Sequence, residues 1–175
     1  MPGTLQDYAQ AVHDVISINR DAEQGFRGAA HAVNDPEIKL MFEQYAAERA
    51  QFATELQAAV RALGFDPIDP QGVGGMVRAS WMSLKGILTG HDVHAILVET
   101  ERAEDSSLKT YRVALSKTLT PEIALIMQRQ FAEVQAANDR IQALCKSTAP
   151  PEDDPVKAVG TAPSVPPKDD VPTGI

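Results

Sequence analysis

Five glutamates interrupt the apolar stripes of the long helices that the sequence predicts, at positions where the helical period favours an apolar residue. They are Glu23, Glu48, Glu101, Glu104 and Glu133. In di-iron and di-manganese four-helix bundles each helix directs a carboxylate inward, and oxygen ligands suit iron and manganese. We therefore predict a metal site for iron or manganese between the helices. Its candidate ligands are Glu23, Glu48, Glu104 and Glu133, with Glu101 as the substitute for Glu104 on the third helix.

The predicted site lacks the histidines that complete such centres. In di-metal bundles two of the helices carry a Glu-x-x-His motif. Here Gln51 stands three residues after Glu48, and Ala136 stands three residues after Glu133. A site made only of carboxylates suits a hard cation, and the missing imidazoles disfavour a redox-active centre. We therefore assign no catalytic residue and no other cofactor, and the expectation leans against an enzyme.

The inward glutamates also have an explanation that needs no metal. Several buried carboxylates cannot all remain ionised without compensation, because desolvation and mutual repulsion both oppose their charge. Arginines on the same helices can supply that compensation, and they are Arg20, Arg102, Arg129 and Arg140. The alternative function is thus a non-catalytic structural or interaction bundle in which no metal is bound. A stress response is one setting for such a protein.

Four long amphipathic helices must position these residues. Their expected bounds are 4–33, 36–63, 92–115 and 123–144. Asp35-Pro36-Glu37 and Thr120-Pro121-Glu122 are parallel start signals, with a capping side chain followed by proline in the first turn. Residues 35–56 also align without a gap on residues 120–141, and the alignment pairs Glu48 with Glu133. We interpret the chain as two copies of one helical hairpin.

A long connection joins the two predicted hairpins. Residues 65–75 are rich in proline and glycine, and residues 76–88 predict a short helix that carries Trp81. This length is enough to run from one end of a bundle to the other, which predicts an all-α, ferritin-like four-helix bundle with one crossover. We expect the bundle to occupy residues 1–146. The Pro-rich, acidic residues 147–175 predict a disordered tail.

Composition and charge exclude several classes of partner. The formal net charge is −8 and the sequence pI is about 4.9, so we expect no nucleic-acid binding. The sequence has no apolar run long enough to predict a membrane span. The single cysteine, Cys145, fits a reducing compartment, so we expect a cytoplasmic protein. Two kinds of partner remain compatible with the sequence: a second copy of the chain in a homo-oligomer, and a protein bound by the acidic tail.

His13 is assigned to the exposed side of the first helix.

Several segments resemble a bacterial family of ferritin-like four-helix-bundle domains of unknown function. They are residues 21–27 (DAEQGFR), 46–52 (AAERAQF), 81–85 (WMSLK) and 101–105 (ERAED). The likeness covers residues 4–145 and implies the ferritin-like fold, without an established activity. Members of the family often carry a histidine near the position of Asn138. Its absence here makes a histidine-ligated centre less favourable.

Overall fold

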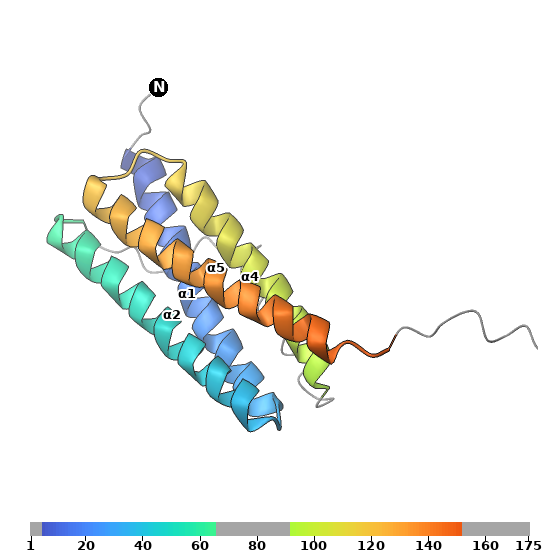
Figure 1. Cartoon of the computed structure of the whole chain (residues 1–175). Coiled ribbons are helices and arrows are strands. Elements are labelled where there is room, and N and C mark those ends of the chain that lie inside the picture. The colour runs from blue at the N-terminus through green and yellow to red at the C-terminus, as the bar shows by residue number, and fades with distance from the viewer. Residues whose placement is uncertain (1–4, 66–91, 152–175) are drawn as a thin grey trace, which may run out of the picture.

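The computed structural model describes residues 5–65 and 92–151, and these form four long helices with no strand among the described residues. The helices are α1 (Leu5–Ala32), α2 (Pro36–Ala62), α4 (Val93–Leu115) and α5 (Pro121–Thr148). They lie side by side as a bundle (Figure 1). The predicted all-helical, four-helix architecture is confirmed.

The helix boundaries arise from the capping residues that the sequence predicts. Asp35 accepts hydrogen bonds from the free backbone amides of Glu37 and Ile38, and Pro36 occupies the first turn of α2. Thr120 caps α5 in the same way through the amide of Ile123. At the other end of α2, Gly64 adopts a φ of 82°, a left-handed conformation that favours glycine.

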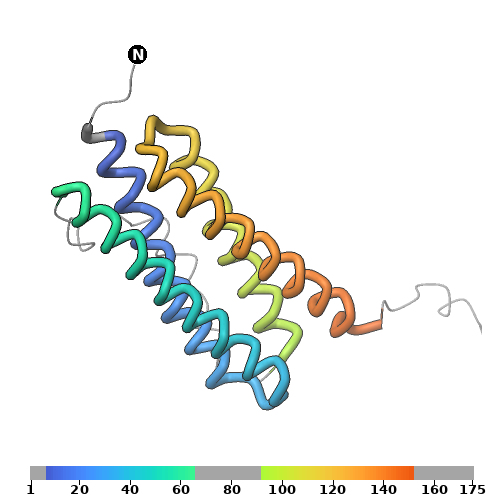
Figure 2. The backbone as a smooth tube through the Cα atoms, turned by 60° about the vertical axis from the view of Figure 1, so that its left-hand side comes forward, coloured from blue at the N-terminus to red at the C-terminus, as the bar shows by residue number. Residues whose placement is uncertain are grey.

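The four helices form two antiparallel hairpins, α1–α2 and α4–α5. The α1 helix packs beside α4, and α2 lies beside α5 (Figures 1 and 2). Both α2 and α4 end at the same end of the bundle, so these two helices run in the same direction. The predicted crossover that must connect them, with its short helix and Trp81, lies outside the described residues.

The interior consists of two apolar clusters with a polar layer between them. One cluster surrounds the α1–α2 turn and includes Phe26, Phe42 and Leu97. The other surrounds the α4–α5 turn and includes Leu56, Leu108 and Met127. Between them lie buried polar side chains that we call the polar layer: Asn19, Arg49, Glu104, Ser107, Tyr111 and Gln130.

Two details differ from the sequence-based expectations. The α5 helix continues through Thr148, where the Thr148 hydroxyl lies 3.0 Å from Nδ1 of His94 and so connects the end of α5 to the start of α4. His13, expected on the exposed side of α1, is only 6% exposed, so that assignment is wrong. The tail was predicted to begin at residue 147, but residues 147 and 148 belong to α5, and the part of the predicted tail from residue 152 onward lies outside the described residues. Within the described part of the chain, no helix is long and apolar enough to cross a membrane.

Candidate functional site

Arg49 of α2 and Glu104 of α4 form an ion pair at the centre of the bundle. Both side chains are 0% exposed, and Nη2 of Arg49 donates to Oε2 of Glu104. The pair joins diagonally opposite helices, because α1 and α5 each pack against both α2 and α4, whereas α2 and α4 do not pack against each other in the described part of the chain. A guanidinium remains charged at any physiological pH, so it brings a permanent positive charge into the core.

The surroundings of Arg49 stabilise its charge in a nearly dry environment. Its Cζ lies 6.0 Å from the ring centroid of Phe26 and 5.8 Å from that of Phe52, both within the range of cation–π attraction. Its Nη1 donates a longer hydrogen bond of 3.5 Å to Oδ1 of Asn19. The guanidinium is therefore held by a carboxylate, an amide and two aromatic faces.

Burial dominates the electrostatics of Glu104. Desolvation raises the pKa of its carboxyl to about 7, while the charge of Arg49 and a hydrogen bond from Ser107 act in the opposite direction. Nearby Glu48 adds a smaller upward contribution to that pKa. Arg49 is thus the main source of positive charge for the most deeply buried acid of the bundle.

A chain of hydrogen bonds links the polar layer across all four helices. The Asn19 side-chain amide donates to the Tyr111 hydroxyl at 2.7 Å, and that hydroxyl donates to Oε1 of Gln130 at 2.9 Å. Nε2 of Gln130 then donates to the backbone carbonyl of Phe52 and, at 2.8 Å, to Oε2 of Glu55. Each amide and hydroxyl in this chain has a defined donor or acceptor role, which fixes the register of the helices.

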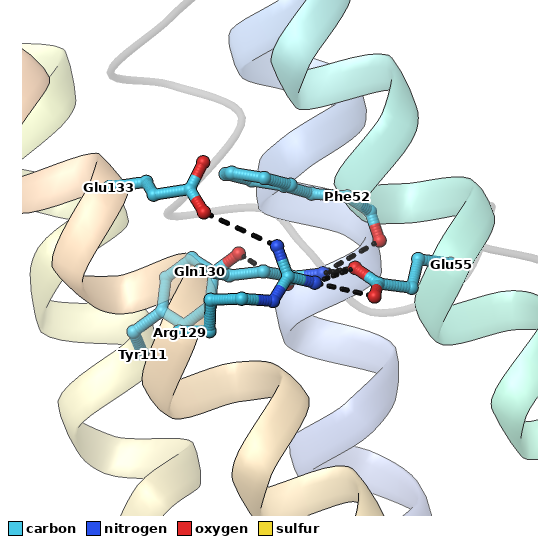
Figure 3. Close-up of polar contacts among 6 residues, drawn as sticks. All are labelled: Phe52, Glu55, Tyr111, Arg129, Gln130 and Glu133. Atoms are coloured by element: carbon cyan, nitrogen blue, oxygen red, sulfur yellow. Dashed lines mark hydrogen bonds and ion pairs between the residues drawn. The ribbon is translucent and has the colours of Figure 1, made fainter.

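The chain of hydrogen bonds reaches the surface between α2 and α5, which we call the α2–α5 seam. Arg129 lies there between two carboxylates, with contacts of 2.5 Å to Glu55 and 3.2 Å to Glu133 (Figure 3). The Glu133 side chain is 42% exposed. Glu133 is therefore a seam residue and not an interior one.

Glu48 lies half-buried on the same seam, one position away from the inward-facing Arg49. Its Oε1 atom is buried and has no hydrogen-bond partner in the described structure. Burial and, less strongly, the charge of Glu133 raise the pKa of the Glu48 carboxyl, whereas Arg49 lowers it. The geometry therefore brings Glu48 near Glu133 and Glu104, with Arg49 close to the group.

The remaining two candidate ligands have other partners. Glu23 pairs with Arg20 and Arg27 on its own helix, at 3.1 and 2.8 Å. Glu101 is half-buried and accepts a hydrogen bond from Gln142. Glu101 also faces Cys145, and burial together with this carboxylate raises the pKa of the Cys145 thiol to about 11. That thiol is therefore protonated at neutral pH and a poor nucleophile.

The contacts across the α2–α5 seam repeat with the internal symmetry of the chain. Gln130 contacts Glu55, and Arg140 contacts Tyr45 through a side-chain hydrogen bond. In the alignment of the two hairpins, Tyr45 is equivalent to Gln130 and Glu55 to Arg140, so each contact is the image of the other. Glu48 and Glu133 are images of each other as well. The internal repeat therefore corresponds to an approximate twofold axis that passes between these two glutamates.

The donor set differs from that of a di-metal centre. No group of three or more His, Cys, Asp or Glu side chains that could hold a metal ion occurs among residues 5–65 and 92–151. Two of the arginine pairings expected in the alternative are present, Arg20 with Glu23 and Arg129 with Glu133. Metal binding by these glutamates stays a prediction.

The central residue of the site, Arg49, was missed in the sequence because an arginine in a bundle helix suggests a solvent-exposed position. A signal for its burial does exist. The buried stripe of α2 recurs at alternating intervals of three and four residues: Phe42, Ala46, Arg49, Ala53, Leu56 and Val60. Arg49 continues this stripe, whereas Glu48 falls beside it.

Comparison with known proteins gives a family without an assigned activity. No curated protein matches the chain. A family model described as "Domain of unknown function (DUF2383)" matches residues 7–117. The matched region covers α1 from its third residue onward, α2 and α4, and it ends before α5 begins. The chain therefore belongs to the DUF2383 family, an uncharacterised domain family.

Proposed function

We propose that this protein is a non-catalytic, ferritin-like bundle that acts by associating with a second copy of the chain, and that its interior polar layer fixes the helix register. The observation that carries the proposal is the ion pair between Arg49 and Glu104. A fully buried guanidinium supplies the counter-charge that a metal ion supplies in di-metal bundles. The ferritin-like part of the proposal draws on the parallel course of α2 and α4, which requires a connection along the whole bundle.

Exposed apolar side chains support a role in association. Leu40 on α2 is 55% exposed and Leu125 on α5 is 66% exposed. These leucines are equivalent in the internal repeat, and each lies eight residues before the glutamate at the approximate twofold axis. Eight residues correspond to about 12 Å along a helix, so the two leucines lie on opposite sides of that axis. A second copy of the chain presents the same pair, which suits a twofold-symmetric contact.

The test combines metal content with oligomeric state. The protein is purified without chelator, and its iron and manganese content and its mass in solution are measured. We expect no stoichiometric metal, no change in melting temperature on adding EDTA, and a dimer that dissociates when Leu40 and Leu125 are both changed to lysine. The matched control changes Gln51, an exposed residue of α2, to lysine and leaves the dimer intact. A monomer at every concentration, or one metal ion per chain, contradicts the proposal.

Metal binding at the seam is the second candidate function. It is favoured by one observation, the buried and unpartnered Oε1 of Glu48 with Glu133 nearby. Iron or manganese is the expected ion, since the candidate ligands are oxygen atoms. Metal analysis of the Glu48→Ala/Glu133→Ala variant decides between the candidates. Metal that is present in the parent and lost in this variant supports the second.

A further inference from the structure

Three acidic or potentially acidic groups near the bundle centre share one neighbouring cation. Arg49 is the positive charge that lowers the pKa of Glu104, of Glu48 and of the Tyr111 hydroxyl. These groups come from two helices, and Arg49 lies between them with no exposed surface. The positive charge of the bundle centre is therefore concentrated in one side chain.

From this arrangement we infer that Arg49 is a covalently attached substitute for a metal ion: its guanidinium neutralises Glu104 and Glu48 and thereby excludes a divalent cation from the bundle centre. The inference rests on the proposed function in one respect, that the intact chain holds no resident metal. It adds which residue prevents metal binding and how that residue does so.

Geometry and charge both support exclusion. The guanidinium donates directly to Oε2 of Glu104, so an incoming ion has to displace it from this oxygen. The displaced guanidinium has no exposed surface and lies against the rings of Phe26 and Phe52. A divalent ion brought beside it also meets repulsion in a medium of low dielectric constant, where like charges interact strongly. The carboxylates alone are suitable donors for a hard cation, and Arg49 occupies the Glu104 oxygen that such a cation would need.

The removal of Arg49 leaves the carboxylates without their counter-charge. Glu104 then lies fully buried beside Ser107, with half-buried Glu48 from the neighbouring hairpin close to it. Buried acids in this situation either take up protons or bind a cation. A divalent ion is the cation that can bridge two carboxylates from different helices.

The experiment measures Mn²⁺ binding by equilibrium dialysis and by the shift in melting temperature, for the intact chain and three variants. Arg49→Met removes the guanidinium and keeps an extended apolar side chain. Arg49→Leu/Glu104→Leu removes both charges. Arg129→Met makes the same change as the first variant at the half-exposed seam arginine and serves as the matched control.

We expect Arg49→Met to bind Mn²⁺ at least about tenfold more tightly than the intact chain, with a rise in melting temperature that EDTA reverses. The other two variants should bind no more Mn²⁺ than the intact chain. An Arg49→Met protein that is unfolded alone and folds when Mn²⁺ is added also supports the inference.

The inference is overturned if Arg49→Met gains no Mn²⁺ affinity, or stays unfolded with Mn²⁺ while the double-leucine variant folds. It is also overturned if the double-leucine variant cannot fold, because the guanidinium would then be needed for more than charge neutralisation. A stoichiometric metal ion in the intact chain contradicts the proposed function itself. Failure of the Arg49→Met arm alone leaves the proposed function standing.

Discussion

Two arginine–glutamate pairs join α2 to the second hairpin. They have the same chemistry but differ in their exposure to solvent. The Arg49–Glu104 pair lies in the centre with no exposed surface. The Arg129–Glu55 pair lies on the α2–α5 seam, with side chains that are half and one-third exposed. The seam pair is screened by water and salt, whereas the central pair interacts in a medium of low dielectric constant. Position therefore decides how strongly each pair constrains the bundle.

The largest effect is expected when one partner of the central pair is removed. Arg49→Met leaves Glu104 buried without its counter-ion, and breaking a buried pair in this way costs about 3–5 kcal/mol of folding free energy. Urea unfolding in metal-free buffer measures the loss. A loss as small as that of Arg129→Met would show that the centre is hydrated and that Glu104 is not isolated from water.

Removing both central charges together should restore most of that loss. In Arg49→Leu/Glu104→Leu no charge remains to be desolvated, and well-packed apolar replacements of buried pairs are often neutral or stabilising by about 1–4 kcal/mol. The comparison of single and double variants forms a double-mutant cycle in urea. A double variant as unstable as the single one would mean that the pair itself contributes net stability.

Stability should also depend on pH through Glu104. The folded-state pKa of this carboxyl is about 7, above its ordinary value of 4.5, so between these values the folded state holds a proton that the unfolded state releases. This group therefore stabilises the fold most below pH 4.5, and its contribution declines as the pH rises to about 7, by at most about 1.4 kcal/mol per pH unit.

Melting temperatures between pH 5 and pH 8 provide the measurement, with Glu104→Gln as the comparison. The glutamine variant cannot titrate at this position. The melting temperature of the parent should therefore fall relative to that of the variant as the pH rises from 5 to 8. Parallel curves would show that Glu104 is ionised throughout this range.

The hydrogen-bonded chain that links the two pairs should give a smaller effect. Gln130→Leu removes the acceptor of the Tyr111 hydroxyl and the donor to Glu55. The Tyr111 hydroxyl keeps the hydrogen bond that it accepts from Asn19 but has no acceptor for its own proton, and an unsatisfied buried donor costs about 1–3 kcal/mol. Urea unfolding measures this loss, and Gln135→Leu, at a half-exposed site on the same helix, is the control.

The smallest effect belongs to the seam pair. Arg129→Met should reduce the folding free energy by no more than about 1 kcal/mol, and the difference should shrink in 1 M salt because exposed ion pairs are screened. Thermal unfolding at low and high salt tests this expectation. A large loss that is insensitive to salt would place the Arg129–Glu55 pair among the interactions of the core.

Local sequence signals predicted the fold well. Asp35 with Pro36, Thr120 with Pro121, and Gly64 mark helix ends by chemistry that involves only neighbouring residues, so these ends could be located from the sequence. The internal repeat predicted two hairpins, and the seam contacts follow that repeat. The all-helical, four-helix bundle is accordingly confirmed.

The site was harder to predict because it depends on contacts between distant parts of the chain. Glu104 was recognised as the inward residue of its helix, but its partner Arg49 is 55 positions away and was not recognised as buried. Glu48 and Arg49 are adjacent, and a rotation of about 100° between neighbours on a helix decides which of them faces the core. That rotation is set by packing against the other helices, which a single sequence does not reveal.

The diagonal position of the central pair also bears on how the chain folds. Arg49 belongs to the first hairpin and Glu104 to the second, so neither hairpin can bury its own charge before the two meet. An isolated hairpin must leave its charged residue in water, and with it part of the apolar surface nearby. Expulsion of water from the core and association of the hairpins are therefore one event, and each half of the chain completes its folding only in the presence of the other.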